Sequence, residues 1–456
     1  MNYLEKIYGI CPVFLQNVAI SFKGILNYFS RYGRKYYKYL NFLKKYDGFT
    51  LEEKKEYQTK EFLNFIIYAK ENSRFYKKIY SNIDVRKFTS IDDIKKLPYI
   101  EKEDLRENID QIVTTKKKSV ECHTGGTTGK SLAVYMTKDD MMKRMATLDF
   151  FKSKAGFINL KMKRATFNGK HIVPQNQKTN VFWRYNLSCK QMIFSSFHIS
   201  ESNLKYYVDE LNRFKPQSID GFFSSICDVA SYIERNKIKL NFTPIAIFPT
   251  SETITETGRN LIEKVFKCQV YNQYASSEGA PFITECKNKK LHMQLHSGIF
   301  EHFEDENDEV LVTSFTTHGT PLIRYRIGDV ISFDHNNGGC CLCGDNQPIV
   351  KSIQGRKFDF LYNAEGVKIN SANISNIFKN IPNAIKRAQM IQVDRNKVTM
   401  FLEVDKKRYV KKYDDLLENE FKAAFGNKTI LEIKHVECIQ REKSGKFQLI
   451  KNMVDE

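Results

Sequence analysis

The chain has 456 residues, of which 41% are hydrophobic and 27% are charged, and it contains 34 Phe and 24 Tyr. This composition excludes a disordered chain and predicts a globular protein, and the length predicts more than one domain. Its 72 Lys and Arg residues against 53 Asp and Glu residues give a formal net charge of +19. The lysines are scattered, so we interpret most of this charge as solvated surface, with a polyanionic partner such as nucleic acid or an anionic membrane face as the alternative.

The apolar stretch "IYGICPVFLQNVAISF" near the N-terminus is the only candidate for a signal or membrane segment. Pro12, Gln16 and Asn17 interrupt it, and no small-residue cleavage pattern follows. It is shorter than the run of about 20 apolar residues that a helix needs to span a bilayer. We therefore expect a cytoplasmic protein without a transmembrane segment, with a peripheral surface helix as the lesser alternative.

Helical patterns dominate the first 115 or so residues, as in "LNFIIYAKENSRFYKKIY", where apolar residues recur at three- and four-residue spacing. "SIDDIKKLPYIEKEDLRENID" predicts a Ser-capped short helix, a Pro break and a second helix. From about residue 130 to 350, helices alternate with apolar runs typical of buried strands: "ATFNG", "QMIFSSF", "SIDGF", "PIAIFPTS", "QVYNQYA" and "EVLVTSF". This alternation predicts an α/β fold with helices packed on sheets.

The pattern changes after "VKSIQGRKFDF". "IKRAQMIQVDRNKVTMFLEV" predicts two strands around a polar turn, "KKYDDLLENEFKAAFG" a helix, and "TILEIKHVECI" a further strand. About 100 residues in this order predict a small α+β domain. We place the domains at residues 1–354 and 355–456, with a hinge near Gly355 and Arg356.

A loop of Gly and Thr, "TGGTTGKS", covers residues 124–131. It is not a Walker loop, because Thr124 stands where that motif requires Gly. Backbone N–H groups and Thr hydroxyls of such a loop can still hold a polyphosphate, since Gly lets the backbone approach phosphate oxygens closely. The alternative is an ordinary glycine turn.

Four more stretches follow the loop in order: "YNQYASSEGA", "PLIRYRIGD", "QGRKFDF" and "REKSGKFQ". Together with the loop they resemble the signature series of the AMP-forming adenylating superfamily, which includes acyl-CoA ligases. "TGGTTGKSL", "YASSEGAPFITEC", "LPYIEKEDLREN" and "GFFSSICDVASYI" are most similar to the phenylacetate–coenzyme A ligase-like proteins, in the branch named for capsular polysaccharide biosynthesis. The resemblance spans nearly the whole chain. It implies a large multi-sheet N-terminal adenylating domain and a small mobile α+β C-terminal domain.

The resemblance also implies roles for individual residues. Glu278 would bind Mg²⁺, Ser277 would touch the α-phosphate, and Lys446 would bridge the substrate carboxylate and the α-phosphate, with Arg326 as a further catalytic residue. Tyr274 would flank the adenine or acyl pocket. The remaining ATP-binding residues would be Asp329 and Arg356 at the ribose, and Thr124, Gly125, Gly126, Thr127, Thr128, Gly129 and Lys130 around the β- and γ-phosphates.

The chemistry agrees with these roles. Attack of a carboxylate on an α-phosphoryl group brings two anions together, so Mg²⁺ on Glu278 and a cation such as Lys446 must offset the developing charge. A carboxylate at pH 7 is already the nucleophile, so no general base is needed.

Coenzyme A is the expected acyl acceptor, with an amine or hydroxyl of a cell-surface polysaccharide precursor as the alternative. Phe358 stands where many relatives carry a hinge Asp or Lys, and Asp359 follows one residue later.

Ten cysteines do not form a disulfide framework here, because seven are dispersed and three cluster at "GGCCLCGD". Related ligase-like proteins carry a Cys, a His and a Cys-x-Cys-Gly in corresponding places. The resemblance therefore implies a structural Zn²⁺ on Cys286, His292, Cys341 and Cys343. His296 and Cys340 are substitutes, and metal-free thiols are the alternative.

A small-molecule carboxylic acid is the expected substrate, and the acyl pocket is assigned to Phe222, Phe223, Ser251, Glu252 and Ala275. A Glu252 carboxylate could meet a substrate amino group, which would favour an amino acid. The composition also allows two alternatives to an enzyme. A basic, zinc-containing nucleic-acid-binding protein would group its cations along one face, whereas these are scattered. A degenerate scaffold would have lost Glu278, Asp329 or Lys446, and all three are present.

Overall fold

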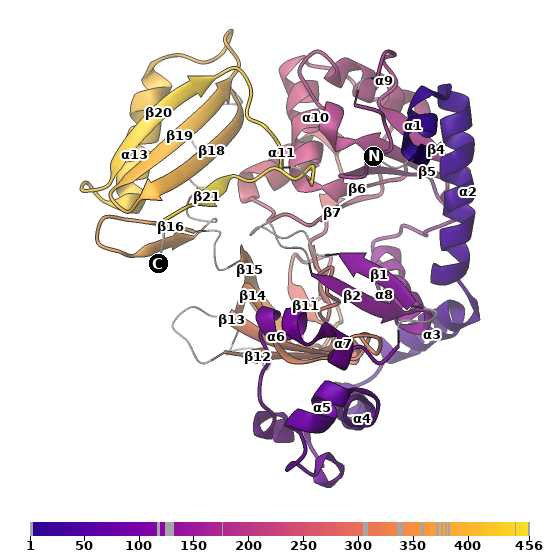
Figure 1. Ribbon diagram of the computed structural model, residues 1–456. Helices are drawn as coiled ribbons and strands as arrows, with labels where there is room; N and C mark the ends of the chain where they lie inside the picture. The colour runs from indigo at the N-terminus through magenta and orange to yellow at the C-terminus, as the bar shows by residue number, and fades with distance from the viewer. Residues whose placement is uncertain are drawn as a thin grey trace. The chain divides into compact units, whose positions relative to one another are not determined.

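The computed structural model describes residues 3–115, 119–123, 132–175, 177–303, 309–334, 341–356, 360–370, 374, 377–378, 381, 384–442 and 444–454. The chain forms two compact units. The first unit combines Met1–Ile20, Met162–Val270 and Gln354–Glu456, and the second combines Ser21–Lys161 and Tyr271–Ile353. Figure 1 shows the elements, coloured along the chain.

A six-stranded sheet lies in the first unit, in the order β4-β5-β3-β6-β7-β8. Its strands are β3 (Arg164–Asn168), β4 (Trp183–Asn186), β5 (Gln191–Ser195), β6 (Ser218–Phe222), β7 (Ala246–Thr250) and β8 (Gln269–Val270). All pairs are parallel except β4 with β5. Helices α9 (Leu204–Phe214), α10 (Phe223–Arg235) and α11 (Glu256–Phe266) share one buried core with these strands. The predicted alternation of helices and buried strands is confirmed here.

The C-terminal part of the first unit has its own core, formed by residues between Leu361 and Ile450. Its four-stranded sheet has the order β20-β19-β18-β21, and β16 pairs with β17 beside it. The elements are β16 (Phe360–Tyr362), β17 (Lys368–Asn370), β18 (Ile385–Asp394), β19 (Lys397–Val404), α13 (Lys412–Phe425), β20 (Ile430–Val436) and β21 (Ile450–Asn452). The predicted order of two strands, a helix and a strand is therefore confirmed. The domain boundary at residue 355 stays a prediction.

A seven-stranded sheet, in the order β12-β13-β14-β15-β11-β10-β9, forms the centre of the second unit. Its strands are β9 (Gln273–Tyr274), β10 (Ile283–Glu285), β11 (Leu291–Met293), β12 (Gly298–His302), β13 (Glu309–Ser314), β14 (Leu322–Phe333) and β15 (Ile349–Arg356). The described pairings within this sheet are antiparallel. This arrangement differs from the parallel sheet of the first unit, so the mixed α/β fold contains several sheets.

Helices cover much of the second unit. They are α3 (Arg34–Tyr46), α4 (Leu51–Asn72), α5 (Arg74–Ile79), α6 (Lys102–Glu107), α7 (Ile109–Ile112) and α8 (Lys138–Lys154). Thr50 and Glu53 form a capping box that starts α4, and Phe62, Phe65 and Ile66 on this helix are buried. The two-stranded pair β1 (Ser119–His123) and β2 (Ala133–Thr137) precedes α8. The predicted phosphate loop joins these two strands and lies outside the described residues.

Two N-terminal helices, α1 (Tyr3–Ile10) and α2 (Val13–Arg31), complete the fold. Within the described part of the chain, no helix is both long and apolar enough to cross a membrane. Short 3-10 turns are found at Val85–Lys87, Ile91–Lys96, Leu187–Cys189, Ser196–His198 and Leu295–Ser297.

Candidate active site and metal centre

Glu278 lies in the loop between β9 and β10, and only 4% of its surface is exposed. Within the described residues, no hydrogen bond or ion pair reaches its carboxylate. A carboxylate that no described protein donor occupies is open to a cation such as Mg²⁺, which prefers carboxylate oxygens. The position therefore suits a metal cation that arrives with the substrate.

The backbone around Glu278 is held firmly. Ser276 Oγ accepts hydrogen bonds from the N–H groups of Gly279 (3.2 Å) and Ala280 (3.0 Å). Buried Arg144, on α8, donates to the carbonyl oxygens of the same two residues at 2.8 and 2.9 Å. Gly279 has φ of +105°, a conformation that favours glycine. The loop thus presents Glu278 in one backbone conformation, with Ser277 exposed beside it.

Tyr274 and Asp329 meet in the second unit. The Tyr274 hydroxyl donates a hydrogen bond of 2.6 Å to Asp329 Oδ2. Tyr274 is buried on β9, and Asp329 is half-buried near the middle of β14. The two residues that the sequence assigns to nucleotide binding are therefore in direct contact.

Arg326 is engaged in contacts within the second unit. Its Nε donates to Glu309 Oε2 at 2.5 Å, its Nη1 donates to Glu101 Oε1 at 3.0 Å, and its guanidinium lies 4.3 Å from the centre of the Phe303 ring. Glu309 is almost fully buried. This geometry suits a structural cation, and a catalytic role for Arg326 stays a prediction.

Several predicted site residues fall outside the description. Residues Thr124, Gly125, Gly126, Thr127, Thr128, Gly129 and Lys130 lie outside the described residues, as do Cys340, Phe358 and Asp359. Arg356 ends β15, and its side chain is outside the description. Ala275 is exposed in the second unit. Their assigned roles stay predictions.

In the first unit, the Lys446 loop, defined here as residues 441–442 and 444–447, is held by hydrogen bonds between its two described parts. The N–H of Gly445 donates to the carbonyl oxygen of Glu442 at 2.8 Å. The N–H of Glu442 in turn donates to the carbonyl oxygen of Lys446 at 2.9 Å. Arg441 Nη1 donates to the Gly445 carbonyl at 3.1 Å. Lys446 therefore sits on a loop whose backbone is fixed on both sides of it.

The Lys446 loop packs closely against Gly169, the residue after β3. A Cβ atom at position 169 would lie 1.8 Å from the carbonyl oxygen of Ser444 and 3.1 Å from a ring carbon of Phe222. Non-bonded atoms do not approach to 1.8 Å, so the contact requires glycine. Phe222 ends β6 and Phe223 begins α10, and both are buried.

Glu252 contacts the Lys446 loop directly. Its Oε1 accepts a hydrogen bond from the N–H of Phe447 at 3.0 Å, and its two oxygens also accept from the N–H (2.7 Å) and hydroxyl (3.0 Å) of Ser224. Ser251, just before it, has φ of +66°, which turns the chain at the end of β7. Burial raises the pKa of Glu252 in spite of these hydrogen bonds. The carboxylate is thus engaged by protein donors, and its predicted contact with a substrate amino group stays a hypothesis.

Asp228, on α10, anchors two arginines from the C-terminal part of the same unit. Its Oδ2 is 2.6 Å from Arg441 Nη2 and 2.8 Å from Arg387 Nη2. Arg387 also lies 3.6 Å from Glu403. Charge-assisted pairs of this kind are strong when they are shielded from water, and all four side chains are at most 14% exposed. The sequence analysis assigned no role to these residues.

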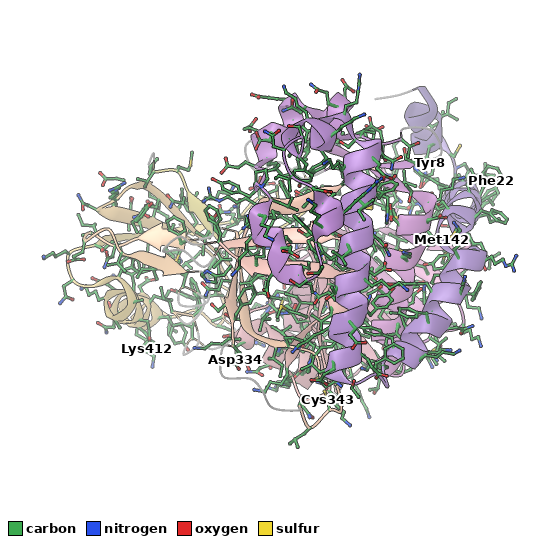
Figure 2. The ribbon with its side chains drawn as sticks, turned by 90° about the horizontal axis from the view of Figure 1, so that it is seen from below. Tyr8, Phe22, Met142, Asp334, Cys343 and Lys412 are labelled. Atoms are coloured by element: carbon green, nitrogen blue, oxygen red, sulfur yellow. The ribbon has the colours of Figure 1, made fainter. Side chains whose placement is uncertain are left out.

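Four predicted ligands form one cluster in the second unit. The ligand atoms of Cys286, His292, Cys341 and Cys343 all lie within 4.8 Å of one another. Figure 2 marks the position of Cys343. The Sγ atoms of Cys286 and Cys341 are 3.7 Å apart, and Cys343 Sγ is 3.6 Å from His292 Nε2. Two thiolates bound tetrahedrally to zinc at about 2.3 Å would be about 3.7 Å apart, so the geometry fits a tetrahedral metal.

The surroundings of this cluster favour metal binding. His292 Nδ1 donates to the carbonyl oxygen of Gln347 at 3.1 Å, which leaves Nε2 facing the thiols. Burial raises the pKa of the Cys341 thiol, but hydrogen bonds from Cys343, His292 and Cys286 outweigh it and lower that pKa to about 7. Burial and the hydrogen bonds with Cys341 and Cys286 raise the pKa of the Cys343 thiol to about 12, so the thiols share their protons. His296, the proposed substitute, instead lies 3.1 Å from the Tyr39 hydroxyl, and burial lowers its pKa to about 3.

A buried lysine on α4 supports the segment that carries Cys341 and Cys343. Lys54 is fully buried, and its Nζ donates to Asn346 Oδ1 at 2.6 Å and lies 3.7 Å from Asp345 Oδ1. Lys154 lies 3.7 Å from the other oxygen of Asp345. Burial lowers the pKa of Lys54. The sequence analysis did not find this support, because no local pattern links α4 to residues almost 300 positions later.

Comparisons with known proteins identify the family. A family model described as the CapK C-terminal domain matches residues 361–453. Protein CapK of Staphylococcus aureus is 38% identical over 460 residues, which cover 99% of this chain and 100% of that protein. The chain belongs to the CapK family.

Solved structures show the fold of this CapK-family chain. A crystal structure of 2-hydroxyisobutyryl-CoA ligase in the postadenylation state, in complex with R3-HIB-AMP, has a TM-score of 0.71 at 14% identity and covers 89% of this chain and 91% of its own. The acyl acid amido synthetase AtGH3.15 in complex with 2,4-DB has a TM-score of 0.56 at 16% identity and covers 84% and 86%. The fold is therefore that of the adenylate-forming ligases, as the resemblance implies.

Proposed function

We propose that this chain activates a small carboxylic acid with ATP and Mg²⁺ to form an acyl adenylate, with release of pyrophosphate, and then transfers the acyl group to coenzyme A. The observation that carries the proposal is Glu278, a buried residue whose carboxylate has no hydrogen bond or ion pair with another described residue and is therefore open to a cation.

Glu278 would hold Mg²⁺, which supplies positive charge at the phosphates of ATP. Lys446 would bring a second cation to the α-phosphate and the attacking carboxylate, and the hydrogen bonds of its loop support a defined position for it. Asp329, held by Tyr274, would accept hydrogen bonds from the ribose hydroxyls. The loop at 124–130, Arg326, Arg356 and Ser277 complete the proposed ATP site. The substrate carboxylate is the nucleophile and forms the bond to the α-phosphorus as the bond to pyrophosphate breaks.

Coenzyme A is our first choice of acceptor, because the net charge of +19 suits a ligand with several phosphates. The alternative is an amine or hydroxyl of a cell-surface polysaccharide precursor. The structural relatives include a CoA ligase and an amido synthetase, so both acceptor classes occur on this fold. We place the reaction in the cytoplasm, where thiols stay reduced, and the described cysteines are free.

We also propose that the Cys286, His292, Cys341 and Cys343 cluster holds a structural Zn²⁺. Three thiols and one imidazole are typical zinc ligands, and four protein ligands leave no open position for a substrate. Such an ion would tie the segment around β10 and β11 to the segment before β15.

Pyrophosphate release tests the proposed function. Purified protein would be incubated with ATP and Mg²⁺ and a panel of aryl, fatty and amino acids, with and without coenzyme A, beside a Lys446→Ala variant. Acid-dependent release that requires Lys446 is the expected result, and an acyl-CoA product would establish the acceptor. If no acid supports release, failure to bind ATP favours the scaffold alternative, and retained ATP binding favours a substrate acid outside the panel. Salt-sensitive binding to nucleic acid without ATP binding would favour a basic, zinc-containing nucleic-acid-binding protein.

A further inference from the structure

Helix α2 presents an apolar face to solvent. Its largest exposed side chains are Phe14 (65% exposed), Phe22 (62%) and Phe29 (69%), and Leu15, Val18, Ile25 and Leu26 complete the set. At about 100° per residue, all seven fall within an arc of about 120° and form a stripe about 22 Å long. Figure 1 shows α2 as the long indigo helix, and Figure 2 marks Phe22 on it.

The other flank of α2 is fixed by polar contacts within the first unit. Gln16 is buried, accepts a hydrogen bond of 2.5 Å from Arg184 Nε, and donates to the carbonyl oxygens of Tyr8 (3.0 Å) and Cys11 (2.8 Å). Asn17 accepts a hydrogen bond of 2.9 Å from the N–H of Tyr185. Ile20 also packs against the buried side chains of Ile172, Val173 and Ile193. These contacts set the rotation of the helix, so the apolar stripe faces outward, where an ordinary surface helix carries polar side chains.

The segment that carries this stripe is strongly basic. Residues 1–46 include eight basic side chains and one acidic side chain, namely Lys6, Lys23, Arg31, Arg34, Lys35, Lys38, Lys44 and Lys45 against Glu5. Lys35 pairs with Asp139 on α8. Lys23, Arg34 and Lys38 are exposed and have no ion pair within the described part of the chain.

A partner for this surface must be apolar and must carry negative charge. Self-association through α2 would bring two such basic segments together, and like charges in contact oppose association. An anionic lipid surface offers both an apolar interior for Phe and Ile side chains and phosphate groups for the lysines. We propose that α2 is an interfacial helix that binds this chain to the surface of an anionic bilayer, with Phe14, Phe22 and Phe29 inserted below the headgroups.

Co-sedimentation with vesicles tests the proposal. The probes are vesicles of phosphatidylcholine alone and vesicles with about one-third phosphatidylglycerol. Wild-type protein should bind the anionic vesicles, and added salt should weaken the binding. Phe22→Ser combined with Phe29→Ser should weaken it at least about tenfold, because two large apolar side chains are lost from the interface. Lys23→Glu combined with Lys38→Glu should weaken binding to anionic vesicles.

Val393→Ser is the matched control, because Val393 on β18 is 66% exposed and lies far along the chain from α2. It should bind vesicles as the wild type does. Both phenylalanines are exposed, so their replacement should leave the circular dichroism spectrum and the thermal transition unchanged. Absence of wild-type binding to anionic vesicles, or equal binding by the Phe22→Ser/Phe29→Ser variant, overturns the proposal. So does a dimer in light scattering that this variant converts to a monomer, because a second copy would then cover the stripe.

Discussion

The Glu252 carboxylate accepts a hydrogen bond from the backbone N–H of Phe447, the residue that follows Lys446, at 3.0 Å. The two residues are 195 positions apart in the sequence. The same carboxylate binds Ser224 at the start of α10, where helix N–H groups lack partners within the helix. Glu252 therefore connects the lysine-bearing loop to the end of the parallel sheet.

Glu252→Ala should reduce the turnover number for pyrophosphate release by about tenfold or more, because hydrogen bonds to a charged group contribute about 1.5–3 kcal/mol each. The KM for ATP should change little, since this residue positions Lys446 rather than the nucleotide. Steady-state kinetics with separate turnover and KM values checks this. Glu252→Gln keeps one oxygen acceptor and should recover part of the rate. A rise in the KM for the acid with an unchanged turnover number would instead favour the substrate-pocket hypothesis.

Asp228→Ala should also slow the Lys446-dependent step, because it leaves Arg387 and Arg441 without their shared carboxylate. Breaking a buried ion pair from one side costs about 3–5 kcal/mol. Stopped-flow measurement of adenylate formation would detect the loss, and thermal unfolding would report the structural part. Asp209→Ala, at an exposed position on neighbouring α9, serves as the control and should match the wild type in both measurements.

Glu278→Gln should separate catalysis from stability. Pyrophosphate release should fall about 100-fold or more, because a charged ligand of the proposed Mg²⁺ is lost. The free energy of unfolding without ATP should change by less than about 1 kcal/mol, because the carboxylate makes no hydrogen bond or ion pair with another described residue. Activity assays and urea titration would be run on the same preparation. A fall of several kcal/mol in the free energy of unfolding, with little change in the rate of pyrophosphate release, would contradict the assigned role.

Tyr274→Phe should raise the KM for ATP by about five- to tenfold with a smaller effect on the turnover number. The change deletes the hydroxyl that donates to Asp329 at 2.6 Å, while the buried ring is kept. Asp329→Asn should have a larger effect, because the proposed ribose acceptor itself changes. Equal KM values for ATP in wild type and Tyr274→Phe would show that this hydrogen bond has no part in nucleotide binding.

Metal analysis should find about one zinc ion per chain, and a strong chelator should lower the melting temperature. Cys343→Ser should lose the ion and at least about 3 kcal/mol of stability, since binding energy at a structural site adds to folding energy. Cys438→Ser removes an exposed thiol outside the cluster and should retain the ion. Protein that contains no metal after growth with added zinc, and that melts at the same temperature with and without chelator, would contradict the zinc assignment.

Local patterns predicted the elements well, because a run such as "SIDGF" is buried along its whole length in β6. The resemblance named Cys286, His292, Cys341 and Cys343, whose ligand atoms lie within 4.8 Å of one another in the structure. It also placed Tyr274 and Asp329 separately in the ATP-binding set, and the structure shows these two in contact. The network of Glu252, Asp228 and the two arginines was beyond prediction. It depends on contacts between distant segments, and neither helix periodicity nor strand alternation encodes which distant side chains will meet. The antiparallel second sheet was missed for the same reason, since strand pairing is set by tertiary contacts.

The approach of Ser444 to Gly169 bears on how such a site is mapped experimentally. Alanine scanning finds functional positions by deleting side chains, and at residue 169 there is nothing to delete. This position contributes by the space it leaves, into which the backbone beside Lys446 fits. Replacing glycine with alanine and then with larger residues would locate it. The smallest side chain at position 169 that abolishes activity would measure how closely the two backbones must approach.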